Sequence, residues 1–505
     1  MDPRELEITL SLKMPHFDEA NEEITLSLKM PHFDEAKEEI PSARGTSLGL
    51  LKVYGNKVKR LRGEMLNEQR SNVPKTSTGF ESLSPNGVMK LARAQLLQLK
   101  TQNADVFSVL SRSFGAQSGL SYEVPRDLEL AMLIQAAAEH VANKKIVSAR
   151  KLLSICHRSA TVSGNPVQRV VYHFAEALEE KIDREWGIVL PGGLEAKFRK
   201  PLDVEQTLIS LEPAMVERQQ ELPILVISEF TGIQSILDSV ASAKRVHIID
   251  FGIRNGSHWT IIMQALADRH SCPLEMLKIT AVGTSKAMME ETGKWLSSFA
   301  RTMNLTLSFK IVVSDLKDLK QDLFEVEADE TVAVYFGLRL FTVLPWPNHL
   351  EAVIGVIKHL KPCAIVMVEL EANLNSPVFL ERFTEALCYF SAVFDCAEGC
   401  LSHHDNCRKL TEQVYLREMI QNMVAEEDSE RTQRFESINF WRGLCARLGL
   451  METELSPSAL CQASLLLKRS ACQDFYTLVN DGKCLILGWK GTPILSISAW
   501  KSSND

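Results

Sequence analysis

A short turn after an apolar run carries the residues best placed for chemistry. The run at 246–249 ends at Asp250, and Gly252 and Gly256 follow in a D-x-G-x-x-x-G spacing before a predicted helix. Such a turn brings backbone N–H groups and a helix N-terminus to the carboxyl edge of a sheet, where doubly wound folds bind ligands. The next apolar run ends in V-G-T-S at 282–285, without the Asp or Glu that would hold a ribose. A nucleoside cofactor is therefore disfavoured, and the alternative is that both glycines permit a tight turn and close helix packing.

Two carboxylates at the predicted end of another strand are the next candidates. Glu369 and Glu371 lie two residues apart and could share an edge with Asp250, which would suit acid–base chemistry if one carboxyl were desolvated. Alternation along a strand, however, directs the two side chains to opposite faces. We therefore favour a structural role, in which they cap nearby helices or pair with Arg382.

The cysteine and histidine pattern does not favour a metal site. Five candidate ligands fall within twelve residues, namely Cys396, Cys400, His403, His404 and Cys407. Zinc sites prefer a C-x2–4-C pair followed by a separated pair, so we predict two inward-facing cysteines, a polar loop and no metal. The 11 cysteines lie mainly in apolar stretches, which indicates reduced thiols rather than disulfides. His247, inside a predicted strand, is expected to be a hydrogen-bonded core histidine.

Alternating helices and strands must position these residues. Apolar periodicity predicts helices from Pro125 to about residue 242. Five runs typical of buried parallel strands follow, separated by helix-length stretches, at 246–250, 277–282, 307–313, 332–336 and 364–369. Two closing runs, 463–468 and 484–489, are predicted to form an antiparallel pair through the N-D-G turn at 480–482.

These elements predict an α/β fold. We expect a Rossmann-like doubly wound sheet, whose strand order resembles that of class I methyltransferases, with an α-helical cap. The folded domain is predicted at 121–502, with the cap mainly at 125–242 and the α/β core mainly at 243–502.

Residues 1–120 differ from the rest and are predicted to be largely disordered. The segment EITLSLKMPHFDEA at 7–20 recurs at 23–36, a tandem repeat with a period of 16 residues. Its alternating apolar residues resemble a plant repression motif that would bind a corepressor, either as an added strand or by filling a groove. The corepressor candidates are Leu10, Leu12, Leu26 and Leu28, and a basic cluster suited to an import receptor comprises Lys57, Lys59, Arg60 and Arg62. The alternatives are a chance alternation in a tail and the solvated face of a helix.

Composition limits the function classes. The 505 residues carry 56 Lys and Arg against 64 Asp and Glu, a net charge of −8, which argues against a chain that coats itself with nucleic acid. We therefore expect contact with DNA to be mainly indirect. No run reaches about 18 apolar residues and the start lacks a signal-peptide core, so we expect no membrane span and a nuclear or cytoplasmic location.

Five ordered blocks resemble the GRAS family of plant regulatory proteins. They are a leucine-rich helical region at about 128–157, VHIID at 246–250, a second leucine-rich region at 286–316, VELEANLNSP with RFTEAL across 368–387, and SAW at 498–500. The block that usually reads RVER departs from the family, because it appears as ERTQR at 430–434. The resemblance is greatest to DELLA-type gibberellin-response repressors, yet no DELLA or VHYNP segment precedes the blocks. We therefore do not expect hormone-receptor-triggered degradation.

The resemblance implies a non-enzymatic nuclear transcription regulator in plant growth or gibberellin-type hormone response, without a cofactor. Its implied partners are DNA-binding transcription factors, zinc-finger proteins foremost, and other GRAS proteins in homo- or heterodimers. The candidates for partner interaction are Val246, His247, Ile248, Ile249, Asp250, Glu369, Glu371, Asn373, Arg382 and Trp500. The alternative is an S-adenosylmethionine-type small-molecule methyltransferase, or a ligand-binding protein, that uses the turn at 250–256.

Overall fold

The computed structural model describes residues 7–10, 26–29, 83–101, 123–186, 222–401, 405–427, 430–470 and 472–503. The chain divides into two compact units, residues 1–80 and 81–505. In the first unit, strands β1 (Glu7–Leu10) and β2 (Leu26–Lys29) pair antiparallel, with Leu10 opposite Leu26. The two copies of the repeat therefore pair with each other, where we had predicted disorder.

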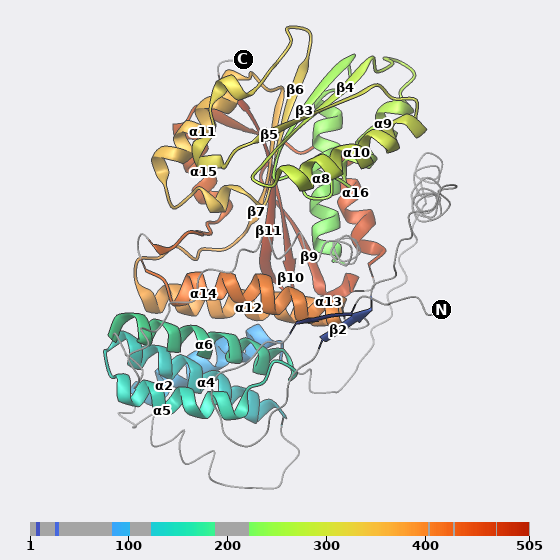
Figure 1. The fold of residues 1–505 in the computed structure, drawn as a ribbon. Coiled ribbons are helices and arrows are strands. Elements are labelled where there is room, and N and C mark those ends of the chain that lie inside the picture. Colours follow the sequence, from blue (N-terminus) through green and yellow to red (C-terminus); the bar gives the residue numbers. More distant parts are fainter. Residues whose placement is uncertain are drawn as a thin grey trace. The chain divides into compact units, whose positions relative to one another are not determined.

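The second unit is built on a nine-stranded sheet (Figure 1). Its parallel strands are β3 (Arg245–Phe251), β4 (Met276–Gly283), β5 (Leu307–Val313), β6 (Thr331–Gly337) and β7 (Ala364–Leu370). Its antiparallel strands are β8 (Leu450–Thr453), β9 (Tyr476–Asp481), β10 (Cys484–Trp489) and β11 (Thr492–Ser502). The order is β5-β4-β3-β6-β7-β11-β10-β9, with β8 paired to β11. Strands β4 and β5 extend the sheet on one side of β3, and β6 and β7 extend it on the other. Strand β11 inserts antiparallel between β7 and β10. The predicted doubly wound, methyltransferase-like fold is therefore confirmed.

Helices cover both faces of this sheet (Figure 1). One face carries α8 (Pro223–Ser239), α9 (Trp259–Ala267), α10 (Lys286–Thr302) and α16 (Pro457–Lys468), and the other carries α11 (Pro347–His359) and α15 (Ile438–Arg447). Short 3-10 turns lie at Leu316–Asp318, Gln321–Leu323, Leu340–Thr342 and Gln473–Phe475. Apolar residues of α11 and α15 pack on Ile249, Phe251 and Trp500 to form a buried core.

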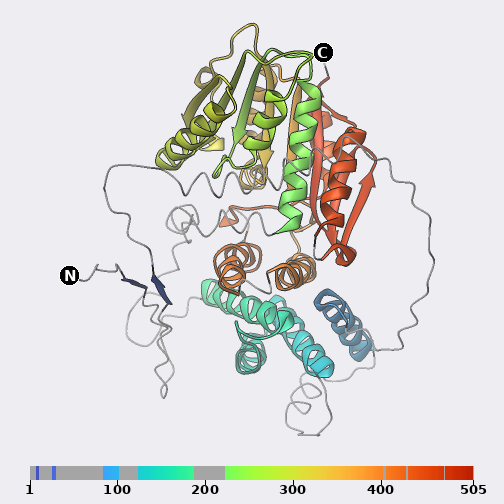
Figure 2. The ribbon, with the colours of Figure 1, turned by 90° about the vertical axis from the view of Figure 1, so that its right-hand side faces the viewer.

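The cap is a second helical layer made from separate parts of the chain. It contains α2 (Pro85–Thr101), α4 (Glu123–Ala142), α5 (Ile146–Ser159) and α6 (Pro166–Trp186), together with α12 (Phe379–Cys400), α13 (Asp405–Leu410), a π-helical turn (Thr411–Leu416) and α14 (Arg417–Val424). Helices α12 and α14 lie between the sheet and the earlier helices (Figure 2). Helix α6 is buried over more than one face, since its buried residues include consecutive positions such as Arg169, Val170 and Val171.

The predicted division of the folded part therefore needs three corrections. Helix α2 buries Val88, Met89 and Leu96 against α4 and α12, so the folded unit begins near residue 81 rather than 121. Helix α8 belongs to the sheet layer, although it lies inside the range predicted for the cap. Helices α12 to α14 belong to the cap, although they lie inside the range predicted for the core.

The predicted strand at 463–468 is also wrong, because this run is the second half of helix α16. Pro457 occupies the first turn of that helix, and the Ser456 side chain caps it by accepting a hydrogen bond from Ala459 N. The N-D-G turn instead joins β9 to β10, with Gly482 in the left-handed region at a φ of 67°. Within the ranges described above, no helix has the length and apolar composition to cross a membrane.

Candidate functional site

The VHIID run forms β3 at the centre of the sheet, and every side chain of 246–250 is at most 1% exposed. The ring nitrogens of His247 form hydrogen bonds with Glu330 Oε2 at 2.9 Å and Thr280 Oγ1 at 2.8 Å. Lys278 Nζ lies 3.1 Å from the other oxygen of Glu330. Burial lowers the pKa of His247 to about 4. His247 is thus a neutral, hydrogen-bonded core histidine, as predicted.

Asp250 joins the end of β3 to the start of α9. Its Oδ2 accepts a hydrogen bond from Trp259 Nε1 at 2.7 Å, and His258 Nε2 lies 3.5 Å from the same oxygen. Both aromatic rings contact Tyr335 of the neighbouring strand β6, at centroid distances of 5.4 Å for Trp259 and 5.7 Å for His258. A buried carboxylate held in this way fixes the geometry of the strand end.

The glycine turn brings the chain close to neighbouring side chains. Gly252 and Gly256 have φ values of 105° and 66°, a region that side-chain-bearing residues rarely adopt. A Cβ atom on Gly252 would lie 2.6 Å from Arg339 Cγ, and one on Gly256 would lie 2.8 Å from Thr292 Cγ2. The turn is therefore tight and closely packed, and the side chain of Arg339 lies against it.

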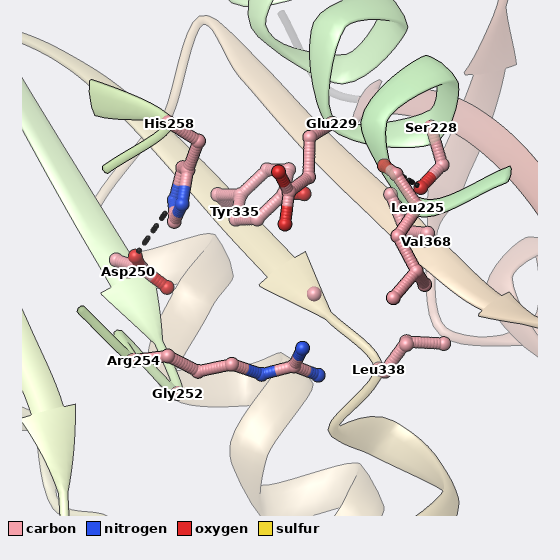
Figure 3. Close-up of a pocket in the computed structure, with 11 residues that line it drawn as sticks. Leu225, Ser228, Glu229, Asp250, Gly252, Arg254, His258, Tyr335, Leu338 and Val368 are labelled. Atoms are coloured by element: carbon pink, nitrogen blue, oxygen red, sulfur yellow. Dashed lines mark hydrogen bonds and ion pairs between the residues drawn. The ribbon is translucent and has the colours of Figure 1, made fainter. Parts of the chain in front are cut away.

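A small cavity opens beside this turn, with its polar side chains pointing inward (Figure 3). Its lining residues are Leu225, Ser228, Glu229, Asp250, Gly252, Arg254, His258, Tyr335, Gly337, Leu338 and Val368. Burial raises the pKa of Glu229, while the charges of His258 and Arg254 act in the opposite direction. The volume of about 20 Å³ holds about one water molecule, whereas small-molecule sites usually measure about 300–1,000 Å³. The residues present therefore do not fit S-adenosylmethionine.

The two carboxylates at the end of β7, Glu369 within the strand and Glu371 just after it, hold backbone N–H groups at helix starts. Glu369 Oε1 accepts hydrogen bonds from Leu340 N at 2.9 Å and Arg339 N at 3.3 Å, at the start of a 3-10 turn. Glu371 Oε2 accepts one from Ile438 N at 2.9 Å, at the start of α15. Burial raises the pKa of both carboxyls, that of Glu369 to about 8. The predicted capping role is confirmed, but the predicted pairing with Arg382 is wrong, because the Arg382 guanidinium instead contacts Glu427 at 2.7 Å.

The loop between β7 and α12, residues 371–378, is the part of this region that reaches the surface. Asn373 and Pro377 are exposed, and half of the side-chain surface of Val378 is accessible. Leu374 is buried and its N–H donates to Phe435 O at 3.1 Å. The β7–α12 loop therefore alternates between anchored and exposed residues.

Three arginines hold this loop through hydrogen bonds, and we call them the arginine clamp: Arg382, Arg431 and Arg434. Arg431 Nη2 donates to Leu374 O at 2.9 Å. Arg434 Nη1 donates to Asn375 Oδ1 at 2.9 Å, and Arg382 Nη1 donates to Ser376 O at 2.9 Å. Arg431 and Arg382 are at most 2% exposed. Three consecutive loop residues are thus each held by one arginine, and two of these arginines are buried.

Comparison with known proteins places this geometry in a family. The GRAS domain family matches residues 130–501. The chain belongs to the GRAS domain family. The DELLA protein GAI1 of Vitis vinifera is 33% identical over 383 residues, which cover 75% of this chain and 62% of that relative. The GRAS family protein RAD1 of Lotus japonicus is 32% identical over 389 residues, 74% of each chain.

A solved structure supports the same assignment. The crystal structure of SCL7 from Oryza sativa has a TM-score of 0.64 at 26% identity, and the match covers 74% of this chain and 99% of that one. This chain spans less than two thirds of the length of the DELLA protein from Vitis vinifera.

Most of the predicted partner-interaction residues of this GRAS domain are buried. The buried members are Val246, His247, Ile248, Ile249, Asp250, Glu369, Glu371, Arg382 and Trp500. Asn373 is exposed. Trp500, one of these candidates, is 1% exposed, and its Nε1 donates to Ser498 Oγ at 2.9 Å. The buried residues shape the GRAS domain and do not form its surface.

The structure also assigns a position to residues that sequence reasoning left unassigned. The RVER-like block supplies Arg431 and Arg434 of the arginine clamp. Nothing in the local sequence links these side chains to a loop more than 50 residues away. Glu229 and Arg339 were missed for the same reason, since each reaches the turn at 250–256 from a distant element.

Several sequence-based predictions remain untested by this structure. In the part of the GRAS-domain protein that is described, no three His, Cys, Asp or Glu side chains are arranged to hold a metal ion. His403 and His404 lie outside those residues, as do Leu12 and the basic cluster Lys57, Lys59, Arg60 and Arg62. Leu10, Leu26 and Leu28 lie in the paired strands β1 and β2.

Proposed function

We propose that this protein is a non-enzymatic nuclear transcription regulator that acts by binding DNA-binding transcription factors, in plant growth or gibberellin-type response. The observation that carries the proposal is the β7–α12 loop. It exposes Asn373, Pro377 and Val378 while the arginine clamp holds the residues between them. An exposed loop on a rigid support loses little conformational freedom on binding, which favours protein recognition.

The cavity beside the turn at 250–256 supports the same conclusion. Its volume suits one water molecule, and the side chain of Arg339 packs against Gly252 on the turn itself. A thermal-shift assay of the full chain with S-adenosylmethionine tests this point. We expect no change in melting temperature at millimolar ligand, and a saturable increase would favour the methyltransferase alternative.

Proximity labelling in plant nuclei tests the proposed surface directly. Val378→Asp places a charge on the β7–α12 loop, and we expect labelling of zinc-finger and other DNA-binding transcription factors to fall at least tenfold. Val479→Asp is the matched control, because half of the Val479 side chain is also exposed, on the distant strand β9. Equal labelling by wild type and both variants, with all three proteins nuclear, would exclude the β7–α12 loop as the contact surface.

The proposal extends to other GRAS proteins as partners, in homo- or heterodimers through the leucine-rich helices, and to a corepressor. Two copies of a leucine motif on one chain would act by avidity, since binding of one copy raises the effective concentration of the other. The variants replace two leucines of a copy by alanine, Leu10 with Leu12 in the first copy and Leu26 with Leu28 in the second. Reporter output should recover partly when one copy is changed and fully when both are changed. Unchanged repression in all variants would show that the repeat is not a corepressor motif.

Nuclear entry is proposed to depend on the basic cluster defined above, Lys57, Lys59, Arg60 and Arg62. A fluorescent fusion in which all four are replaced by alanine should become cytoplasmic. Retention in the nucleus would assign import to another segment.

A further inference from the structure

Two thiols at the end of helix α12 contact one tyrosine hydroxyl, and a third thiol from a separate segment lies against the same turn of the helix. Cys400 Sγ lies 3.0 Å and Cys396 Sγ lies 3.3 Å from Tyr476 Oη. Cys472, which precedes the 3-10 turn before β9, places its Sγ 3.1 Å from Gly399 O. A Cβ atom on Gly399 would lie 3.8 Å from Cys472 Sγ, so Cys472 packs against the residue that precedes Cys400. Cys396 lies 4 residues before Cys400, but Cys472 lies 72 residues after it. The fold, and not the local chain, therefore brings Cys472 to this cluster.

The three thiols differ in exposure. Cys396 and Cys472 are buried, whereas the side chain of Cys400 is half-buried and reaches solvent. Hydrogen bonds from Cys396, Tyr476 and Cys472 lower the pKa of the Cys400 thiol to about 7. Asp395 opposes this shift, but its carboxylate already accepts a hydrogen bond from Trp489 Nε1 and pairs with Lys490, both at 2.7 Å.

We propose that Cys400, Cys472 and Tyr476 form a thiol modification site at which hydrogen peroxide converts Cys400 and Cys472 into a disulfide. The Cys400 thiolate attacks one oxygen of the peroxide, so that an S–O bond forms, the O–O bond breaks and hydroxide leaves. Cys472 then attacks the sulfenic sulfur, an S–S bond forms, and the departing oxygen takes the proton of Cys472 as water. The hydroxide takes up the proton that the Cys400 thiol released when it ionised. The two thiols thus lose two electrons to the peroxide, and the overall products are one disulfide and two water molecules.

Cys472, and not Cys396, is assigned as the resolving thiol for a geometric reason. Cys396 and Cys400 lie four residues apart on α12, where Cβ atoms are about 5–6 Å apart, whereas a disulfide needs about 3.5–4.5 Å. Cys472 lies in a separate segment against the last turn of α12 and is free of this restriction. The disulfide would link α12, a helix of the cap, to the segment that leads into the hairpin of β9 and β10.

Peptide mapping of the full wild-type chain under non-reducing conditions tests the site without any variant. After brief treatment with equimolar hydrogen peroxide at pH 7, we expect a cross-linked peptide that contains Cys400 and Cys472 and disappears with dithiothreitol. Cys461, an exposed thiol on α16, is the internal control, and Cys400 should react with iodoacetamide about tenfold faster than it. No cross-link, or a cross-link from Cys400 to another cysteine, would overturn the proposal.

Variants separate the roles of the thiols. Cys400→Ser and Cys472→Ser should each abolish the cross-link, and Cys472→Ser should accumulate a sulfenic acid at Cys400 that dimedone traps. Cys396→Ser and Cys461→Ser should retain the cross-link. A cross-link that survives in Cys472→Ser but is lost in Cys396→Ser would show that Cys396, and not Cys472, is the resolving thiol, and would overturn the proposal. Circular dichroism of each reduced variant shows whether that variant is folded. If a variant is not folded, the peptide map of the wild-type chain decides whether Cys400 and Cys472 form the disulfide.

Discussion

Replacement of Arg431 by methionine separates the positioning of the β7–α12 loop from the stability of the fold. The guanidinium is 2% exposed and donates to Leu374 O at 2.9 Å, and burial, with Arg382 and Arg434 nearby, lowers its pKa to about 10. Loss of a hydrogen bond to a charged group costs about 1.5–3 kcal/mol. The lowering of the Arg431 pKa from 12.5 to about 10 means that the charged guanidinium destabilises the folded state by about 3 kcal/mol. Methionine carries no charge, so the substitution removes this cost.

These two effects nearly cancel. We therefore expect urea denaturation to show a change of less than about 1 kcal/mol in the unfolding free energy of Arg431→Met. Amides of 373–378 should exchange with deuterium at least tenfold faster, because one of three anchors is gone. Partner affinity should fall about tenfold, which corresponds to about 1.4 kcal/mol of added ordering cost.

The matched control is Arg447→Met, an exposed arginine on α15, which should leave both stability and loop exchange unchanged. A loss of more than about 3 kcal/mol in Arg431→Met would exceed the cost of one lost hydrogen bond to a charged group and show that the arginine clamp is a stability device. Unchanged exchange in 373–378 would show that Arg431 does not hold the loop. Either result would refute the reasoning behind the proposed surface.

Three further predictions concern stability and boundaries. Because the pKa of His247 is lowered from 6.5 to about 4, the unfolded state binds more protons than the folded state between these values. The contribution of neutral His247 to the unfolding free energy is therefore present above pH 6.5 and is lost as the pH falls. Urea titrations should show a loss of about 2 kcal/mol between pH 7 and pH 5 in the wild type but not in His247→Gln. Asp250→Ala leaves Trp259 Nε1 without its acceptor, so melting temperature and partner binding should fall together, and binding lost at an unchanged melting temperature would make Asp250 a direct contact. Limited proteolysis should leave a resistant fragment that begins near residue 81, and a fragment that begins after residue 120 would show that α2 is not part of the folded unit.

The sequence by itself determined the parallel strands and the family. Buried parallel strands need continuous runs of β-branched residues, so the five runs from 246 to 369 identified β3 to β7 without any tertiary information. The ordered blocks around VHIID were enough to indicate the GRAS family, because each block is a local string. Strand alternation directed Glu369 and Glu371 to opposite faces and so favoured a structural role, either as helix caps or in a pair with Arg382.

Tertiary structure decided everything that depends on contacts between distant segments. The run at 463–468 is apolar enough for a strand or a helix, and its N-terminal cap and neighbours made it helical. The cap combines helices from two separate parts of the chain, 85–186 and 379–424, which no local periodicity can show. The arginine clamp and the thiol cluster likewise join residues tens of positions apart, because the hydrogen-bond partner of a side chain is set by which elements pack together and not by its neighbours in the chain.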